Sequence, residues 1–519
     1  MTPSGGPVIC VVIGRTRHKM MQVEIQEAAK QGARLIELRL DYLAKAPDFK
    51  RLLANKPCPM IATVRRPVDG GRWSGTEEER HMLLRQAIIA GFDYVDLETD
   101  IANKIARFGK VKRIISYHNL QETPEDLEKI HGRMCDQDPD IVKIAATAQQ
   151  PSDNVRVLKL LPNTPKPTVA HCMGDLGTPS RIISVQMGAP FTYGAFNRER
   201  TFAPGLMTFQ ELKKVYHLEN INGLTAVYGV IGDPVGHSLS PLVHNRAMMN
   251  KRINGVYVPF RVPRGELAPF LKSFDELHIQ GYSVTIPHKE AAAALARTKD
   301  NLVSEIGAAN TLIRGADGWM AYNTDAPAAI ESLKANMPVG PDGMPQHLRD
   351  RVVLLLGAGG VARALAYALA EEGTNLVLSN RTLERGQRLA EDVGCRAVDW
   401  NARHNVVCDI LINCTSVGMY PNLDESPVHN SFLKPGLMVF ETIYTPETTL
   451  LVREAQNRGC HVLTGVDMFV RQAALQFKLF TGKEPDLAMM TRTVRRALSP
   501  VQAQADEEEG DGEAPAEEP

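Results

Sequence analysis

The sequence lacks the cysteine pairs and the charge excess that mark several classes of protein. Its eight cysteines, in 519 residues, include no CxxC pair and no cluster with histidine, which is typical of reduced thiols in a cytosol. The formal net charge is −1, so no overall field attracts nucleic acid or an anionic membrane. We therefore expect small-molecule partners, no metal site and a cytoplasmic protein.

The sequence also offers no membrane anchor in its first apolar run. Residues 8–13 are too short to span a membrane, and they lack the basic flank and cleavage site of a secretory signal. We interpret them as a strand. At 519 residues the chain is too long for one core and suggests about three or four domains.

Residues 7 to about 220 alternate short apolar, β-branched runs with helical patterns, which favours a parallel sheet. The eight runs are PVICVVIG, RLIELRL, PMIATVR, FDYVDLE, RIISYHN, DIVKIAA, PTVAHCM and FTYGAF. Eight strand–helix units in this length predict a closed (β/α)8 barrel. The active site of such a barrel lies at the C-terminal ends of its strands.

Lys143 places an ammonium group inside the otherwise apolar run DIVKIA, where it shares a strand face with Ile141 and Ala145. A lone lysine near a strand end usually extends its amine to solvent. Burial, in contrast, lowers the pKa of an amine and supplies the neutral nucleophile that imine chemistry requires.

Several polar residues map to the same rim as Lys143 and favour the chemical interpretation. They are Glu37, Arg39, Arg65, His118 and Arg181. Each one alone is more often an ion pair, a surface charge or a structural histidine. Together they suit imine formation on a small anionic carbonyl compound, with the histidine moving protons.

The segments ELRLD, TVR, SYH and VKIA, in this order, resemble type I 3-dehydroquinate dehydratases across residues 7–220. The resemblance implies that Lys143 forms an imine with the ketone of 3-dehydroquinate, and that His118 removes a proton and assists the loss of water. It also implies substrate binding by Glu37, Arg39, Arg65, Asp69 and Arg181.

The barrel departs from this family at three positions. Asp69 stands where better-known members have Glu, which keeps the charge and shortens the reach. In the closing loop after the eighth strand, Phe202 and Leu206 replace a hydroxyl and an amide that contact the substrate.

The second half carries seven short motifs, each of which is weak by itself: SLSP, SVTIPHK, GAANT, NTD, GAGGVAR, NRT and NCTSVGM. As an ordered set they resemble the shikimate dehydrogenase family. The resemblance implies that Lys289 and Asp325 are the acid/base pair at the reacting hydroxyl. It implies substrate binding by Ser238, Ser240, Thr285, Asn310, Tyr444 and Gln472. Ser283 replaces the Asn of many bacterial members.

The segment GAGGVA follows an apolar strand and opens a helix, which is the context of a dinucleotide-binding turn. At the end of the next strand an NAD enzyme places a carboxylate, whereas this chain has two guanidinium groups. The sequence therefore predicts NADP. The predicted cofactor-binding residues are Gly357, Ala358, Gly359, Gly360, Asn380, Arg381, Thr382, Arg385, Thr415 and Gly465.

As a whole, the chain resembles fused enzymes of the shikimate pathway that dehydrate 3-dehydroquinate and then reduce 3-dehydroshikimate with NADPH. The expected parts are a TIM barrel at 1–220, a substrate-binding α/β domain at 224–340, a Rossmann-like NADP domain at 345–462, C-terminal helices that return to the substrate domain at 463–498, and a disordered acidic tail at 499–519.

Two other interpretations stay open at this point. One is a different imine-forming barrel, such as an aldolase, joined to a quinate dehydrogenase. The other is an inactive barrel that is retained as a metabolite sensor. The sequence does not indicate the oligomeric state.

Overall fold

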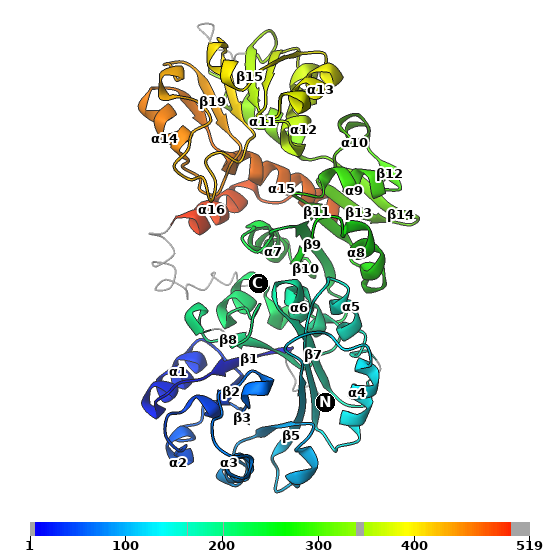
Figure 1. Ribbon diagram of the computed structural model, residues 1–519, viewed down its shortest axis with the longest axis vertical. Helices are drawn as coiled ribbons and strands as arrows, with labels where there is room; N and C mark the ends of the chain where they lie inside the picture. The colour runs from blue at the N-terminus through cyan, green and yellow to red at the C-terminus, as the bar shows by residue number, and fades with distance from the viewer. Residues whose placement is uncertain (1–5, 163, 201, 339–346, 500–519) are drawn as a thin grey trace, which may run out of the picture. The chain divides into compact units, whose positions relative to one another are not determined.

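The structure, a computed structural model, describes residues 6–162, 164–200, 202–338 and 347–499 (Figure 1). The chain divides into two compact units, Met1–Pro241 with Arg252–Gln280, and Leu242–Lys251 with Gly281–Pro519. The sequence predicts a loop in PVGPDGMPQ, residues 338–346, and a disordered acidic tail at 499–519. Residues 339–346 and 500–519 of these segments lie outside the described residues.

The first unit contains a ring of eight parallel strands, and each of the eight predicted runs forms one of them. The strands are β1 (Val8–Ile13), β2 (Leu35–Arg39), β3 (Met60–Thr63), β4 (Tyr94–Glu98), β5 (Lys112–His118), β6 (Ile141–Thr147), β7 (Thr168–Met173) and β8 (Phe191–Ala195). Their order in the sheet is β7-β6-β5-β4-β3-β2-β1-β8. Within the described part of the chain no ladder joins β7 to β8, so the expected closed barrel is nearly rather than fully closed.

Helices surround the ring of strands on its outside, as Figure 1 shows. They are α1 (His18–Lys30), α2 (Phe49–Leu52), α3 (Glu77–Ala90), α4 (Leu127–Cys135), α5 (Asp153–Leu158) and α6 (Thr178–Gln186). Local sequence sets their limits. Helix α3, for example, begins with a capping box of Thr76 and Glu79 and ends at Gly91, whose φ is 102°.

The inside of the ring is filled by alternate residues of the strands, because successive strand side chains point to opposite faces. Cys10 and Val12 of β1, Ile61 of β3, Ile114 of β5 and Ile141 of β6 belong to this inner cluster. The inward position of Ile141 places the side chain of the residue two positions later on the same face. Lys143 therefore points inward, as predicted.

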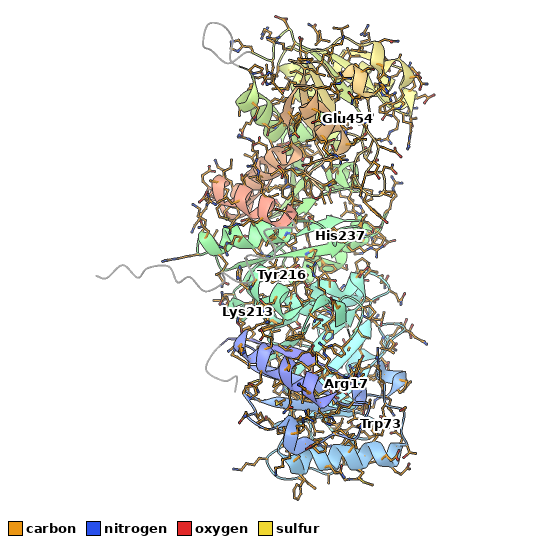
Figure 2. All side chains as sticks on the ribbon, turned by 90° about the vertical axis from the view of Figure 1, so that its left-hand side faces the viewer. Arg17, Trp73, Lys213, Tyr216, His237 and Glu454 are labelled. Carbon is orange, nitrogen blue, oxygen red and sulfur yellow. The ribbon has the colours of Figure 1, made fainter. Side chains whose placement is uncertain are left out.

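The segment after β8 packs back onto the barrel. The amide of Ala195 donates to the carbonyl of Met207 at 2.9 Å. A short helical turn, Glu211–Val215, follows. Its Lys213, labelled in Figure 2, donates from Nζ to the carbonyl of Gln31 at 2.6 Å. These contacts hold the end of the barrel region against its beginning.

The first unit also contains a parallel strand pair that follows the barrel. Strand β9 (Ala226–Gly232) pairs with β10 (Gly255–Arg261) over seven residues. Helix α8 (Leu267–Ser273) follows β10 along the chain.

The second unit begins with antiparallel strands. Strand β11 (Gly281–Val284) pairs with β13 (Thr311–Gly315), and β13 forms a hairpin with β14 (Gly318–Tyr322), as the turn sequence Asp317-Gly318 predicts. Gly318 has a φ of 132°, which only glycine adopts readily at a turn. The short strand β12 (Thr298–Lys299) pairs in parallel with β14. The helices here are α9 (Lys289–Leu295), α10 (Asn301–Ile306) and α11 (Asp325–Asn336).

A six-stranded parallel sheet follows in the order β17-β16-β15-β18-β19-β20. Its strands are β15 (Val352–Leu356), β16 (Asn375–Ser379), β17 (Arg396–Val398), β18 (Ile410–Asn413), β19 (Met438–Glu441) and β20 (His461–Leu463). The accompanying helices are α12 (Gly360–Glu371), α13 (Leu383–Val393), α14 (Leu450–Asn457), α15 (Gly465–Thr481) and α16 (Leu487–Leu498). This is the Rossmann-like order predicted for a dinucleotide-binding domain.

None of the helices in the described ranges has both the length and the apolar content that a membrane crossing requires.

Candidate active sites

A cavity of about 310 Å³ lies at the C-terminal ends of the barrel strands. The structure brings together there all seven residues that the sequence predicted for the barrel site. They are Glu37, Arg39, Arg65, Asp69, His118, Lys143 and Arg181. Because they come from strands and loops spread over the first unit, their convergence is a property of the folded chain.

Lys143 is buried in this cavity but is not isolated from charge. Its Nζ lies 3.1 Å from Asp96 Oδ2 and 3.7 Å from Glu37 Oε1. It also lies 4.2 Å from the centroid of the Tyr193 ring. The sequence suggested an amine surrounded by apolar groups, whereas the structure places two carboxylates and an aromatic ring beside it.

Asp96 is a functional neighbour that sequence reasoning missed. Its carboxylate accepts from Ser116 Oγ at 2.5 Å and forms an ion pair with Arg65 at 2.8 Å. Burial by itself raises the pKa of Asp96, but the charges of Arg65 and Lys143 outweigh burial and hold this pKa well below its usual range. The alternation in the run YVDLE, which places Asp96 and Glu98 on one strand face, was the signal that could have found it.

Arg65 is held by two carboxylates and is not free to bind a ligand as a lone cation. Besides Asp96, it pairs with Glu98 through Nη1 at 2.7 Å. Glu98 in turn accepts from the fully buried Arg80 at 2.6 Å. This chain of buried charges fixes the position of Arg65 at the edge of the cavity.

Glu37 and Arg39, both predicted to bind substrate, contact other charged groups and not each other. Arg39 donates to both carboxylate oxygens of Asp41, at 2.9 and 3.0 Å. Glu37 instead accepts from Thr63 Oγ1 at 2.6 Å and faces the amine of Lys143. Both side chains line the cavity, but each has its own partner.

Arg181 is the cavity arginine for which no ion pair is found among the described residues. It is 1% exposed, and its Nε and Nη2 have no hydrogen-bond partner in the described chain. Burial lowers the pKa of Arg181 to about 10. An unpaired buried guanidinium is costly, so this side chain is available to a bound carboxylate.

His118 faces the cavity as a neutral imidazole. Burial, followed by the positive charges of Arg65 and Lys143, holds the pKa of His118 well below its usual range. Its Nδ1 has no hydrogen-bond partner among the described residues. A neutral histidine with a free nitrogen can act as a proton acceptor.

The loop after β8 covers the cavity even without the hydroxyl and amide of the related family. The amide of Gly174 donates to the carbonyl of Pro204 at 3.0 Å. Gly205 has a φ of 70°, and a Cβ there would lie 2.4 Å from the carbonyl oxygen of Gly174. Phe202 packs edge-on against Tyr42 at 5.1 Å between ring centroids. Backbone bonds and an aromatic contact therefore hold this loop.

Asp69, the shortened carboxylate, lines the cavity from the loop after β3. Its Oδ2 accepts from Arg66 Nε at 2.8 Å. The same loop is anchored where the amide of Trp73, labelled in Figure 2, donates to the carbonyl of Arg65 at 3.1 Å. The carboxylate of Asp69 is therefore positioned by its neighbour Arg66.

The predicted acid/base pair of the second half is in direct contact. Lys289, at the start of α9, lies with Nζ 2.5 Å from Asp325 Oδ2, at the start of α11. The turn before Asp325 is ordered by Asn323, whose Oδ1 accepts from the Asp325 amide at 3.0 Å. Two helix starts and one turn thus hold the lysine against the carboxylate.

Asn310 uses its side chain to order this site. Its Nδ2 donates to Thr324 Oγ1, and its Oδ1 accepts from the Thr324 amide, both at 2.9 Å. Ser283 donates to Gln476 Oε1 at 2.7 Å, and Gln476 donates back to the carbonyl of Asn310 at 3.0 Å. Sequence reasoning missed Gln476, which lies one helical turn beyond the predicted Gln472.

Tyr444, Gln472 and Thr285, which were also predicted to bind substrate, each have their own contacts. The ring of Tyr444 stacks on Phe469 at 4.3 Å, and burial raises the pKa of Tyr444. Gln472 donates to the carbonyl of Phe469 at 3.0 Å. Thr285 begins the loop after β11, where its carbonyl accepts from the His288 amide at 2.9 Å.

Ser238 and Ser240 belong to the first compact unit. Ser240 is the first residue of helix α7 (Ser240–Asn250). Its amide donates to Ser238 Oγ at 3.2 Å. The pair therefore forms the cap-like helix start that its sequence suggested.

The glycine turn after β15 has the geometry of a dinucleotide-binding turn. Gly357 has a φ of 116°, and a Cβ there would lie 2.8 Å from the carbonyl oxygen of Cys414. Gly359 precedes helix α12, and open space surrounds the position of its missing Cβ. A Cβ on Gly360 would lie 3.1 Å from Lys289 Cδ. The helix start therefore lies beside the acid/base pair.

Two arginines, Arg381 and Arg385, follow the end of strand β16. Arg381 is exposed, and Arg385 donates to the carbonyl of Ala358 at 3.5 Å. Asn380 donates to the carbonyl of Thr382 at 2.7 Å, which shapes the turn. The open glycine turn and the two guanidinium groups fit a dinucleotide that carries a 2′-phosphate.

Thr415 and Gly465 complete the predicted cofactor residues. Thr415 donates to Asn413 Oδ1 at 2.7 Å. A Cβ on Gly465 would lie 2.4 Å from the carbonyl oxygen of Ile443, so only glycine allows this helix start to pack so closely.

Comparison with known proteins covers both halves of the chain. The profile of Type I 3-dehydroquinase matches residues 9–223. The Bifunctional 3-dehydroquinate dehydratase/shikimate dehydrogenase, chloroplastic, of Arabidopsis thaliana is 38% identical over 496 residues, which are 92% of this chain and 82% of that protein. The chain belongs to this bifunctional family.

The second half of this family member matches three further profiles. They are the Shikimate dehydrogenase substrate binding domain at 230–312, Shikimate / quinate 5-dehydrogenase at 343–429, and the Shikimate 5'-dehydrogenase C-terminal domain at 465–495. The Shikimate dehydrogenase (NADP(+)) of Pyrococcus furiosus is 40% identical over 274 residues, 52% of this chain and 96% of that protein. A crystal structure of a shikimate dehydrogenase in complex with NADP+ aligns with a TM-score of 0.50 and 34% identity, over 54% of this chain and 98% of that chain.

Proposed function

We propose that this chain catalyses two consecutive steps of the shikimate pathway. The first half dehydrates 3-dehydroquinate to 3-dehydroshikimate, and the second half reduces 3-dehydroshikimate to shikimate with NADPH. The observation that carries the first step is the shared cavity of Lys143, neutral His118 and unpaired Arg181. The 2.5 Å contact between Lys289 and Asp325 beside the glycine turn supports the second.

In the first step, the Lys143 amine attacks the ketone, and water leaves to form an iminium ion. His118 removes a proton from the carbon next to the iminium. The hydroxyl one carbon further on then leaves as water with that proton, and hydrolysis of the iminium frees Lys143. Arg181 binds the substrate carboxylate, while Asp96 and Glu37 compensate the positive charge that develops at Lys143.

In the second step, NADPH, when bound, would supply the hydride that reduces the ketone carbon. Lys289 donates a proton to the oxygen that becomes the hydroxyl, and Asp325 keeps the ammonium in place. The glycine turn from Gly357 to Gly360 would hold the pyrophosphate of the cofactor. Arg381 and Arg385 would bind its 2′-phosphate, with Asn380, Thr382, Thr415 and Gly465 shaping the pocket.

The other assignments belong to the same proposal. Glu37, Arg39, Arg65 and Asp69 complete the first substrate site. We assign binding of the second substrate to Ser238, Ser240, Thr285, Asn310, Tyr444 and Gln472, as the resemblance to shikimate dehydrogenases implies. The domain limits predicted from the sequence are part of the proposal. The eight free cysteines support a reducing compartment, so we place the enzyme in a cytoplasm, although the Arabidopsis relative is named as chloroplastic.

Borohydride trapping tests the barrel chemistry directly. The full chain is incubated with 3-dehydroquinate and borohydride, and its peptides are identified by mass spectrometry. We expect a reduced adduct on Lys143, and we expect Lys143→Ala to lose both adduct and dehydratase turnover. Lys112→Ala, at the opposite end of a barrel strand, is the matched control and should keep both. Dehydratase turnover that survives Lys143→Ala would overturn the proposal.

Initial rates test the second half. We expect 3-dehydroshikimate to be reduced with NADPH, and NADPH to be preferred over NADH by at least about tenfold, or 1.4 kcal/mol. Equal or faster oxidation of quinate than of shikimate would instead identify the second half as a quinate dehydrogenase.

A further inference from the structure

Two polar side chains that the proposed mechanism does not use face the barrel cavity. His171 in β7 and Tyr193 in β8 both line it, and each is 4% exposed. Nδ1 of His171 and the hydroxyl of Tyr193 are buried and have no hydrogen-bond partner in the described part of the chain. Buried polar groups are almost always paired, so two unpaired ones in one cavity point to a bound molecule.

Both groups carry no charge at neutral pH. Burial, followed by the positive charges of Arg181 and Lys143, holds the pKa of His171 well below its usual range. Burial, followed by the charge of Glu37, raises the pKa of Tyr193 well above its usual range. A neutral imidazole and a phenol hydroxyl are suited to pairing with the hydroxyl groups of a ligand, while the carboxylate is left to Arg181.

The two side chains lie beside the groups that hold the reacting molecule. The Tyr193 ring centroid is 4.2 Å from Lys143 Nζ, and the ring of His171 is 6.2 Å from that of Tyr193, tilted by 58°. The side chains of Phe202 and Leu206, which close the cavity from the loop, offer no hydrogen bond. Polar contacts are therefore available from the strands and not from these two loop positions.

We propose that the hydroxyl of Tyr193 and Nδ1 of His171 are substrate-binding groups that pair with hydroxyl groups of the substrate. They make the barrel selective for a polyhydroxylated cyclic ketone. The contacts come from β7 and β8 and replace those that Phe202 and Leu206 cannot make. The inference rests on the proposed dehydratase function, because that function supplies the substrate class.

The test uses the full chain and three substitutions. Tyr193→Phe removes one oxygen and keeps the ring beside Lys143. His171→Leu removes the ring nitrogens, and His171→Asn restores a polar atom near the position of Nδ1. Tyr94→Phe, at the opposite end of a barrel strand and outside the cavity, is the matched control.

Each variant is measured in three ways. The first is the 3-dehydroquinate concentration that gives half-maximal borohydride trapping on Lys143, the second is kcat and KM of dehydration, and the third is Tm without ligand. We expect Tyr193→Phe and His171→Leu to raise the half-saturating concentration and KM by about three- to tenfold, with a smaller change in kcat. His171→Asn should recover part of the loss. The Tm of Tyr193→Phe should not fall, because an unpaired hydroxyl is removed.

The results that would reject this inference differ from those that would reject the proposed function. Half-saturating concentrations of Tyr193→Phe and His171→Leu that match the wild type and Tyr94→Phe would overturn this inference while leaving the dehydratase intact. A lower Tm of Tyr193→Phe with unchanged KM would also overturn it, since the hydroxyl would then have a structural partner. Absence of trapping and turnover in the wild type would instead reject the proposed function itself.

Discussion

Glu441, at the end of β19, couples the stability of the Rossmann-like sheet to pH. It is fully buried, and its oxygens accept from Asn413 Nδ2 at 3.0 and 3.1 Å, from the Ile443 amide at 3.1 Å and from Thr449 Oγ1 at 3.0 Å. Burial raises the pKa of Glu441 from 4.5 to about 7, because these hydrogen bonds offset only part of the lost hydration. The same Asn413 orients Thr415 in the predicted cofactor pocket.

The sign of the effect follows from the raised pKa. Above pH 4.5 the unfolded chain loses a proton that the folded chain retains until about pH 7. The stabilisation by Glu441 is therefore fully present below pH 4.5 and is lost as the pH rises through about 7. The difference between the two pKa values corresponds to about 3 kcal/mol.

Glu441→Gln keeps the side chain in a neutral form at every pH. The remaining oxygen can accept from the Ile443 amide, and the new amide nitrogen can donate to the Thr449 hydroxyl. We expect the free energy of unfolding of the variant, relative to the wild type, to rise by about 2–3 kcal/mol between about pH 5 and about pH 8.

Urea unfolding of the full chain at several pH values measures this difference. The transition is followed by hydrogen exchange of peptides that cover β18 and β19, which reports the opening of this sheet. Glu391→Gln, an exposed position in α13, is the control and should show no pH-dependent difference. A difference for Glu441→Gln that stays constant within about 1 kcal/mol, or that shrinks as the pH rises, would refute a protonated Glu441 in the folded chain.

Three further predictions concern the proposed catalytic groups. Asp96→Asn leaves the buried Lys143 with one less counter-charge, so we expect the free energy of unfolding to fall by about 3–5 kcal/mol. Chemical denaturation measures this loss, and a loss below about 1 kcal/mol would contradict the ion pair. Gly360→Ala places a methyl group 3.1 Å from Lys289 Cδ, so dehydrogenase kcat should fall about tenfold while dehydratase kcat, the internal control, is unchanged. Because the pKa of His118 is held well below its usual range, its base form persists into acid. The pH profile of dehydratase kcat/KM should keep its plateau below pH 6.5, and an acidic limb centred at or above 6.5 would be inconsistent with this environment.

The strands of the barrel and the positions of the reactive residues could be predicted from local pattern. Alternation in DIVKIA placed Lys143 on the inward face with Ile141, and the structure confirms that orientation. The glycine turn at Gly357 and the hairpin at Gly318 also follow from local sequence, because their positive φ values require glycine. Such features depend on residues that are close together in the sequence, so the sequence alone can predict them.

The partners of those residues could not be predicted, because they come from distant parts of the chain. Asp96, which pairs with Lys143, lies 47 residues away in sequence, and Gln476, which accepts from Ser283, lies 193 residues away. Arg39, Arg65 and Arg181 were all expected to bind substrate at the barrel rim. Only the folded arrangement decides that carboxylates bind Arg65, whereas no ion pair of Arg181 is found among the described residues.

The sequence by itself determined which chemistry this protein carries: a lysine and a histidine on barrel strands, an acid/base pair in the second half, and a glycine turn with cations after it. Tertiary structure alone decided the charge environment in which the barrel groups work. Electrostatic energies and desolvation depend on distances of a few ångströms between side chains, and those distances arise only when separate strands meet at one end of the barrel.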